Sequence, residues 1–154
     1  MTVSTHFIHM KEAIALAQQA YAVAEVPVGC VIVKDGRVIA KAHNLTRTSC
    51  DPTAHAEILC LQEAGRVLQS AYLEDCDLYV TLEPCPMCAG ALSWSRIRHL
   101  YYGAYDSKSG GVEHGPRVFE HTTCHHAPGI TGGMLEEECA SIMKNFFCDV
   151  RKKS

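Results

Sequence analysis

Residues 77–104 read DLYVTLEPCPMCAGALSWSRIRHLYYGA, and the order of elements in this segment predicts the fold class. It begins with DLYVTL, a short apolar run that predicts a buried strand. Pro84 and Pro86 end that strand and open a helix over CAGALSWS, because proline cannot donate to a strand ladder and is tolerated in the first helical turn. RHLYYGA, residues 98–104, predicts a second strand. A strand, a helix and a strand in succession indicate an α/β protein.

The N-terminal part of the chain predicts one helix and then a hairpin. Apolar residues recur there at steps of three and four, which predicts a helix with one buried stripe. The stripe consists of Phe7, Met10, Ile14, Ala17 and Tyr21. The runs VPVGCVIV and RVIAKA that follow predict two strands, and the Asp35-Gly36 pair between them suits the positive φ angles of a tight type I′ turn.

Two further helices and an edge strand complete the expected elements. Asp51 as an N-cap and Pro52 in the first turn predict a helix that ends near Gly65. GITGG, residues 129–133, predicts an edge strand. Helical spacing predicts a last helix with the apolar residues Leu135, Cys139, Ile142, Met143, Phe146 and Val150. Because strands and helices alternate after the hairpin, the sequence predicts a mixed sheet covered by helices on both faces.

Composition limits the possible functions. The net charge of −3 argues against a non-specific nucleic-acid binder, whose affinity would come from neutralising phosphates. The apolar runs are far shorter than the roughly 20 residues that cross a bilayer, and Lys11 and Glu12 stand where a signal peptide would be apolar. We therefore expect a cytoplasmic protein with no membrane partner.

The nine cysteines are odd in number and irregularly spaced, so the sequence predicts reduced thiols and no disulfide framework. Four of them lie in strand or helix patterns and are expected to be small core residues. These four are Cys30, Cys60, Cys139 and Cys148.

One group of residues combines metal-binding and acid–base side chains at a specific spacing. His55 and Glu57 stand two apart, and a Pro-Cys-x-x-Cys motif with Cys85 and Cys88 follows them. With nine cysteines in 154 residues, a Cys-x-x-Cys pair arises about 0.5 times by chance. A preceding proline and a His-x-Glu within a window of about 15 upstream positions lower this expectation to roughly one in a thousand. The constellation is therefore a strong signal.

These residue types suit a catalytic zinc ion. Zinc takes four ligands and favours Cys and His, and a catalytic site leaves one position open for water. His55, Cys85 and Cys88 supply three ligands, which leaves Glu57 free to move protons. Residues two apart point about 200° away from each other in mid-helix. His55 and Glu57 can therefore share a pocket at a helix N-terminus, where side chains lean toward the helix start. We expect the cysteine pair to open a helix of its own.

A closed structural zinc site is the alternative that the motif leaves open. Its fourth ligand would come from HTTCHH, residues 121–126, whose metal-binding side chains are His121, Cys124, His125 and His126. The same cluster would otherwise be a separate metal site or a polar loop.

His-Ala-Glu followed by Pro-Cys-x-x-Cys resembles the signature of the zinc-dependent nucleobase deaminases. More narrowly, the chain resembles the bacterial tRNA adenosine deaminases over nearly its whole length. The segments that carry this resemblance are EVPVG at 25–29, Asn44, DPTAHAEI at 51–58, TLEPCPMCAGA at 81–91, GAYDSKSGG at 103–111 and the terminal helix with Phe146-Phe147.

The resemblance implies a single deaminase domain over residues 1–154. Its fold would be a three-layer α/β/α sandwich around a mixed sheet of about five strands, as in the cytidine deaminases. The family also implies a homodimer that binds the tRNA anticodon loop. The implied reaction is hydrolytic conversion of the wobble adenosine of an arginine tRNA to inosine.

Carried over by position, the resemblance makes His55, Cys85 and Cys88 the ligands of one Zn²⁺ per chain. Glu57 becomes the proton shuttle for attack of a zinc-activated water on C6 of adenine. The implied substrate-binding residues are Asn44 at the flipped nucleoside, Pro27 and Val28 along the base pocket, and Asp106, Lys108 and Phe147 near the neighbouring nucleotides or the backbone. The family often has a basic residue where Tyr105 stands, and a tyrosine there offers a stacking surface instead.

Two other functions share part of this signature. A deaminase of free guanine, cytosine or a nucleoside would use the same zinc chemistry, but the GAYDSKSGG loop and the basic tail at 151–153 favour RNA. A zinc-stabilised interaction module without enzymatic activity would need no open coordination position. Ammonia release from tRNA compared with release from free bases distinguishes a tRNA deaminase from a free-base deaminase. An exchangeable water on the metal distinguishes a catalytic zinc site from a structural one.

Overall fold

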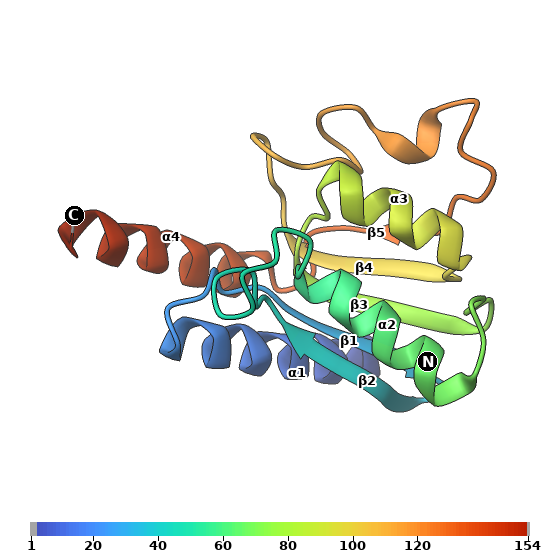
Figure 1. The fold of residues 1–154 in the computed structure, drawn as a ribbon, viewed down its shortest axis with the longest axis horizontal. Helices are drawn as coiled ribbons and strands as arrows, with labels where there is room; N and C mark the ends of the chain where they lie inside the picture. Colours follow the sequence, from blue (N-terminus) through green and yellow to red (C-terminus); the bar gives the residue numbers. More distant parts are fainter. Residues whose placement is uncertain (1–2, 154) are drawn as a thin grey trace.

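Five strands form one mixed sheet in the order β2-β1-β3-β4-β5 in the computed structural model, which describes residues 3–153 (Figure 1). β1 is antiparallel to β2 and to β3, whereas β3, β4 and β5 run parallel. The elements are α1 Val3–Ala22, β1 Gly29–Lys34, β2 Arg37–His43, α2 Ala56–Leu68, β3 Cys76–Leu82, α3 Pro86–Ser95, β4 His99–Ala104, the 3₁₀ turn η1 Val118–Glu120, β5 Gly129–Thr131 and α4 Glu136–Lys153.

Helices cover both faces of this sheet, which confirms the expected three-layer α/β/α arrangement. α1 and α4 pack on one face, and α2 and α3 pack on the other (Figure 1). Each face has its own apolar cluster. Met10, Val31 and Tyr79 belong to the cluster under α1 and α4, and Ile32 and Leu92 belong to the cluster under α2 and α3. Neighbouring residues such as Val31 and Ile32 alternate between the two clusters because side chains alternate across a strand.

The predicted hairpin is confirmed in its turn as well as in its strands. Asp35 and Gly36 have φ angles of 51° and 75°, as a type I′ turn requires. At the other end of β1, helix α1 lies so close to the strand that a Cβ on Gly29 would stand 1.9 Å from the Ala13 carbonyl oxygen. Glycine is therefore needed at position 29 for steric reasons.

Three details differ from the sequence predictions. The buried face of α1 contains Met10, Ile14 and Ala17 as predicted, but Phe7 is 37% exposed, and Ala13 and Ala20 are buried in addition. Cys148 is only partly buried, since the C-terminal half of α4 extends beyond the sheet (Figure 1). Helix α2 begins at Ala56 and not near position 52. The carboxylate of Asp51 accepts hydrogen bonds from the Thr53 backbone and hydroxyl, at 2.9 and 2.7 Å, and so forms a turn ahead of the helix.

The β3-α3-β4 unit positions the site. β3 is buried along most of its length and pairs in parallel with β4, so the loops that follow both strands meet at the same edge of the sheet. Ligand sites of parallel sheets lie beyond the carboxyl ends of the strands, where such loops converge. Among the helices of residues 3–153, none combines the length and apolar character needed to span a membrane.

Candidate zinc and substrate site

The first residues of two helices face each other at this edge. His55 is the N-cap of α2 and Cys85 is the N-cap of α3, and both have extended backbone angles. Pro86 enforces this geometry on Cys85, because a residue before proline is pushed out of the helical region, and it then occupies the first turn of α3. Neither side chain makes the usual capping hydrogen bond to the backbone of its own helix. The imidazole and the thiol are therefore free to bind a ligand such as a metal ion between the two helix N-termini.

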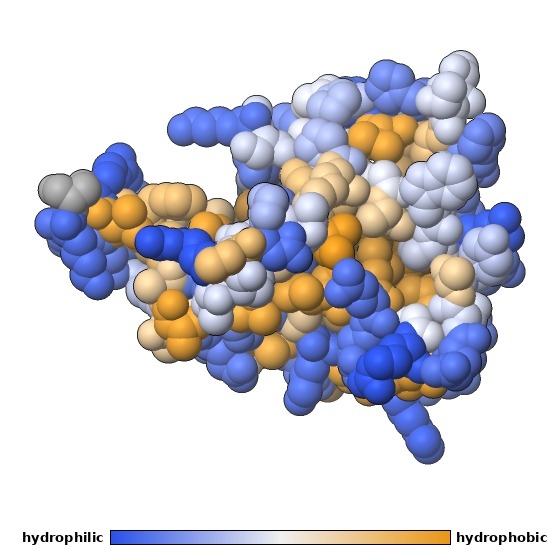
Figure 2. Space-filling model, in the orientation of Figure 1, coloured by the Kyte–Doolittle hydropathy of each residue, from blue (hydrophilic) through white to orange (hydrophobic). Residues whose placement is uncertain are grey.

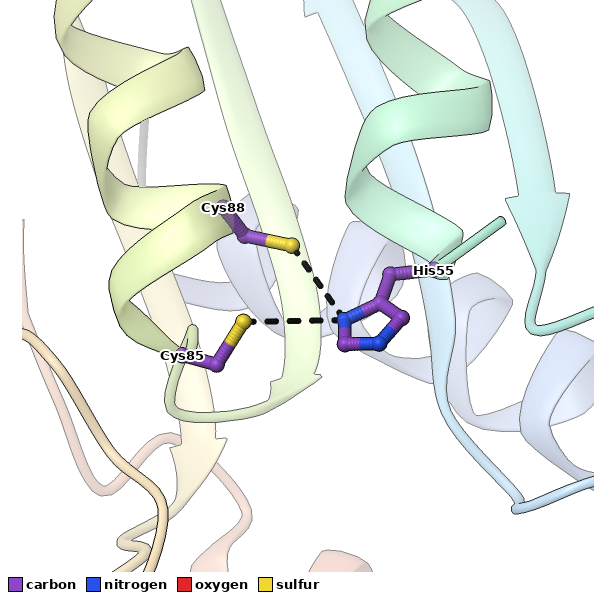
Figure 3. A group of neighbouring side chains, drawn as sticks. All are labelled: His55, Cys85 and Cys88. Carbon is purple, nitrogen blue, oxygen red and sulfur yellow. Dashed lines mark hydrogen bonds between the residues drawn. The ribbon is translucent and has the colours of Figure 1, made fainter. Parts of the chain in front are cut away.

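The spacing of these side chains fits one zinc ion. His55 Nδ1 lies 3.6 Å from Cys85 Sγ and 3.5 Å from Cys88 Sγ (Figure 3). Two ligands on a tetrahedral zinc, with Zn–S near 2.3 Å and Zn–N near 2.0–2.1 Å, stand about 3.5 Å apart. Within residues 3–153 this is the one group of three or more such side chains close enough to share a metal ion. The three residues form the set that the sequence predicted.

The surroundings of the group change the acidity of its members. A hydrogen bond from Cys88, opposed by burial and aided by His55, lowers the pKa of Cys85 to about 4. The same contact and burial raise the pKa of Cys88 well above its usual range. The Cys85 contact raises the pKa of His55. The group thus already contains one thiolate, the form in which cysteine binds a metal.

Glu57 lies next to this group in the first turn of α2 and is only 4% exposed. Burial raises its pKa to about 7. A carboxyl group with a pKa near neutrality can both accept and release a proton, which is the property required of a general acid and base. His55 and Glu57 line the same pocket, as expected for side chains at a helix N-terminus.

A pocket of about 640 Å³ opens from these residues toward α4. Five of the six predicted substrate-binding residues line it, namely Asn44, Val28, Asp106, Lys108 and Phe147. Pro27 is buried and does not belong to the lining. Phe147 is 44% exposed, so its ring faces the pocket and is not a core residue.

The remaining lining residues were given no contact role from the sequence, apart from the stacking surface expected of Tyr105. They are Val26, Thr46, Leu82, Glu83, Tyr105, Ser107, Ser109, Ala140 and Met143, together with Ala56, Cys85 and Ala104 beside the motif residues. Sequence reasoning also missed Glu25, which is fully buried behind the pocket and accepts a hydrogen bond from Asn44 Nδ2 at 3.4 Å. Its position at the start of EVPVG, a segment that carries the family resemblance, was the available signal.

The HTTCHH segment forms hydrogen bonds and no metal cluster within the described chain. Cys124 Sγ donates to the His126 carbonyl oxygen at 3.1 Å and lies 3.3 Å from Ser93 Oγ. The His126 ring contacts the Ile97 carbonyl oxygen at 2.8 Å. These contacts hold a loop against the C-terminal part of α3. None of its side chains joins the group around His55, so the closed four-ligand site is not formed.

Comparison with known proteins defines the class. A family model for the cytidine and deoxycytidylate deaminase zinc-binding region matches residues 3–104. That region contains the three side chains whose spacing fits zinc, and the match and the geometry together support one Zn²⁺ per chain. Fold and site are those of the zinc-dependent deaminases.

Individual relatives narrow this class. The tRNA-specific adenosine deaminase of Agrobacterium fabrum is 50% identical over 151 residues, covering 98% of each chain. A solved structure from work on A-to-I editing by tRNA:A34 deaminases at the wobble position of transfer RNA has a TM-score of 0.86 and 52% identity, over 88% of this chain and 98% of that one. Guanine deaminase from Bacillus subtilis has a TM-score of 0.63 and 42% identity, over 68% and 66%. The chain belongs to the family of the tRNA-specific adenosine deaminases.

Proposed function

We propose that residues 1–154 act as one deaminase domain that converts adenosine at the wobble position of a tRNA anticodon to inosine. The observation that carries this function is the zinc-spaced group of His55, Cys85 and Cys88 beside the buried carboxyl group of Glu57, at the inner end of the pocket. The relatives that match along their full length are named for this activity. The Bacillus subtilis guanine deaminase is 42% identical over 68% of the chain, whereas the tRNA-specific adenosine deaminase of Agrobacterium fabrum is 50% identical over 98%, so sequence similarity supports a tRNA substrate.

His55, Cys85 and Cys88 would hold the zinc ion. When bound, zinc acts as a Lewis acid that makes a water molecule nucleophilic near neutral pH. Glu57 performs the proton transfers. Its carboxylate accepts the proton of the attacking water, delivers it to N1 of the adenine as C6 is attacked, and serves again when the amine departs as ammonia.

The pocket orients the base and excludes water. Asn44 is 5% exposed, and its side chain is fixed by Glu25 and by Thr46 Oγ1 at 3.2 Å. A fixed amide can hold the nucleoside in one orientation, which is how positioning lowers a barrier. Val28 and Leu82 give the pocket apolar walls. An unpaired anticodon loop supplies the base without the cost of opening a duplex.

The outer part of the pocket offers contacts to neighbouring nucleotides. Tyr105 and Phe147 expose aromatic rings of the kind on which bases stack. Lys108 also lines the pocket and is exposed, so its ammonium group can meet a phosphate. These contacts support an RNA substrate over a free base, which would leave all three unused.

We also infer a homodimer formed through the α2–α3 face. An apolar groove of about 490 Å³ runs between the two helices, lined by Ile58, Leu61 and Ala91, and Trp94 stands beside it 77% exposed. Figure 2 shows apolar atoms along this face. A groove next to a projecting apolar ring suits a two-fold interface, in which one patch meets its own copy.

All nine cysteines are free of disulfide bonds, which agrees with a location in the reducing cytoplasm.

The experiment that tests the function is incubation of the purified protein with unmodified total tRNA, followed by nucleoside analysis. We expect inosine to appear and its formation to be lost in Glu57→Gln. Parallel incubations with free guanine, cytosine and adenosine should release little ammonia. Rapid ammonia release from guanine with no inosine in tRNA would instead establish the small-molecule deaminase.

A further inference from the structure

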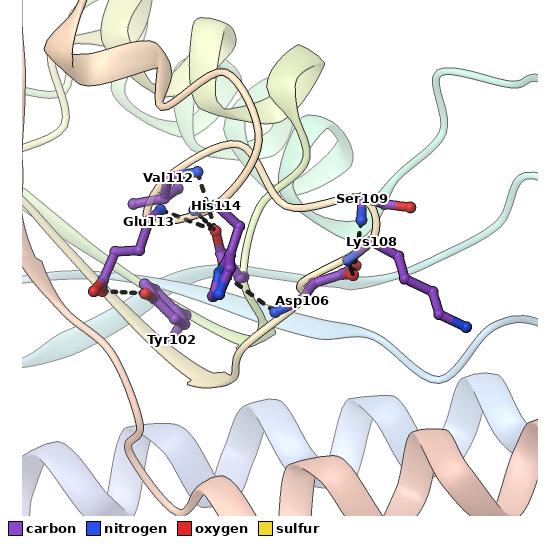
Figure 4. A network of polar contacts seen from close by, with 8 residues as sticks. Tyr102, Asp106, Lys108, Ser109, Val112, Glu113 and His114 are labelled. Carbon is purple, nitrogen blue, oxygen red and sulfur yellow. Dashed lines mark hydrogen bonds and ion pairs between the residues drawn. The ribbon is translucent and has the colours of Figure 1, made fainter.

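A buried carboxylate of the β3–α3 connection organises one wall of the pocket. Glu83 is 2% exposed. Its oxygens accept hydrogen bonds from the backbone N–H groups of Asp106, Val112, Glu113 and His114, at 3.1, 3.2, 2.9 and 3.0 Å, and one lies 2.8 Å from the His114 ring (Figure 4). A buried charge is costly without partners, so these five contacts are what allows Glu83 to be ionised inside the protein.

The donors all belong to residues 106–114, which we call the pocket loop. Its first part lines the pocket with Asp106, Ser107, Lys108 and Ser109. Asp106 Oδ1 in turn accepts hydrogen bonds from the backbone of Lys108 and Ser109, at 3.1 and 2.9 Å (Figure 4). The Glu83 carboxylate therefore fixes Asp106, and Asp106 fixes the backbone that carries Lys108.

The pocket loop fits tightly against this carboxylate. A Cβ on Gly110 would stand 2.5 Å from Glu83 Oε2. A Cβ on Gly111 would stand 2.6 Å from the backbone nitrogen of Pro86. The buried Tyr102 donates a further hydrogen bond to Glu113 (Figure 4). Such close packing leaves the loop one arrangement as long as the carboxylate stays in place.

We propose that Glu83 is a positioning residue, whose carboxylate holds the pocket loop in the arrangement that receives the nucleotides next to the target adenosine. The inference rests on the proposed function for its substrate. Glu83 lines the pocket but is not one of the zinc-spaced side chains, and its oxygens are occupied by the pocket loop. Its loss should therefore weaken substrate binding and leave the chemical step largely intact. A role limited to folding would instead lower stability without changing the affinity of the folded enzyme.

Glu83→Gln is the direct test. The amide group would place an NH₂ donor against N–H groups that now meet an oxygen. We expect the backbone amides of Asp106, Val112, Glu113 and His114 to exchange with solvent at least about tenfold faster by NMR. We expect KM for tRNA to rise about tenfold, with kcat changed less than about threefold. Zinc content should stay at one per chain.

Asp77→Asn is the matched control. Asp77 is a buried carboxylate near the opposite end of the same strand, where Arg98 contacts both of its oxygens at 2.9 Å. Its replacement should lower stability yet leave KM and the exchange of the pocket-loop amides unchanged. If Glu83→Gln does not fold, His114→Ala removes the ring contact alone and should raise KM about threefold.

The proposal is overturned if Glu83→Gln folds with unchanged amide exchange or unchanged KM. A Glu83→Gln variant that loses both its zinc and its kcat would also overturn the proposal. Glu83 would then support the β3–α3 connection that carries Cys85, and not the pocket loop. An unchanged KM in His114→Ala counts against it when the glutamine variant cannot be studied. Failure of the wild-type protein to form inosine would refute the proposed function alone, since the exchange measurement needs no activity.

Discussion

At the scale of single residues, the site depends on two helix N-caps whose side chains do not cap. Most N-cap side chains accept a hydrogen bond from their own helix, which contributes roughly 1 kcal/mol. His55 and Cys85 make no such bond and turn toward each other instead. Each helix start therefore lacks the stability that a capping bond would supply. Metal binding can provide it, because metal binding contributes free energy to folding.

Glu57→Gln tests the proton shuttle. The amide has the shape of the carboxyl group but cannot take a proton from water, so we expect turnover to fall by a factor of about 10² to 10⁴ or more. Zinc content should remain one per chain because Glu57 is outside the ligand group. Inosine formation and metal content measured on the same preparation check both parts. Near-normal turnover in this variant would remove Glu57 from the mechanism.

Zinc affinity should depend on pH through two of the three ligands. In the metal-free protein the strongly raised pKa of Cys88 keeps that thiol protonated, whereas Cys85, with a pKa of about 4, is already a thiolate. The raised pKa of His55 means that its ring takes up a proton more readily than an ordinary histidine as pH falls. Zinc must displace those protons, so acid weakens binding. We expect log Kd to rise by about one per pH unit as pH falls from 8, and by nearly two below the pKa of His55.

A competing chelator of known affinity gives this Kd at each pH. Cys88→Ala supplies the comparison, because it removes a ligand and should abolish stoichiometric binding at every pH. A wild-type Kd that does not change between pH 6 and 8 would contradict the assigned protonation states.

At the scale of secondary-structure elements, the sequence predicts best where a residue has only one possible local role. Asp35-Gly36 specifies its turn by backbone conformation, and Pro86 specifies the start of α3. The start of α2 was predicted too early because Asp51 can either cap a helix or close a turn, and the Thr53 contacts decide for the turn. The cap rule does not distinguish the two.

The contact between α1 and β1 makes Gly29 the most sensitive glycine of the hairpin. In Gly29→Ala the added methyl would meet the backbone of Ala13 and Ala17, which cannot move without lifting the helix. We expect a loss of about 3 kcal/mol in the free energy of unfolding, at the upper end for overpacking. Gly36→Ala is the matched variant, because its Cβ meets nothing within 4 Å and adds only the strain of a positive φ, roughly 1–2 kcal/mol.

Denaturant unfolding of both variants gives the comparison. Equal losses in Gly29→Ala and Gly36→Ala would mean that α1 is not held against β1 as tightly as the structure has it.

The two loops beside the pocket are held by buried glutamates, and this makes stability depend on pH. Burial would raise the pKa of Glu25, but hydrogen bonds from Thr48 and Arg47 outweigh it and lower the pKa below its ordinary value of 4.5. Backbone donors from the pocket loop do the same for Glu83. A lowered pKa contributes stability that is present above about pH 4.5 and lost as pH falls through the folded-state value.

We therefore expect the free energy of unfolding to fall between pH 5 and pH 3, and to fall less steeply in Glu25→Gln. Urea titrations at several pH values measure both slopes. The variant should already be less stable at pH 7, since the contacts to Asn44 and Thr48 no longer involve a charge. Parallel pH dependences in the two proteins would show that Glu25 titrates normally when folded.

At the scale of the whole molecule, sequence reasoning reached the layers, the metal group and five residues of the pocket lining, but not the buried glutamates that hold the loops around the pocket. His55, Cys85 and Cys88 were recognisable because metal chemistry restricts residue type and spacing together. Glu25 and Glu83 hold backbone groups of loops that are distant in sequence, and any acceptor of the right length meets that need. Both residues stand in segments that carry the family resemblance, but their burial and their backbone contacts appear only once those loops are placed, so the sequence assigned them no role.

The exposed α2–α3 face also concerns the whole molecule, because its role depends on contact between two copies of the chain. Trp94→Glu places a charge on the most exposed large apolar side chain among the described residues. If the face joins two copies, the charge would be buried twice in a two-fold interface, so we expect the dimer to dissociate at micromolar concentration. Ile8→Glu is the control, since Ile8 is exposed on α1 across the sheet and should leave the assembly unchanged. Sedimentation velocity separates the species, and a Trp94→Glu protein that sediments like the wild type would place the interface elsewhere.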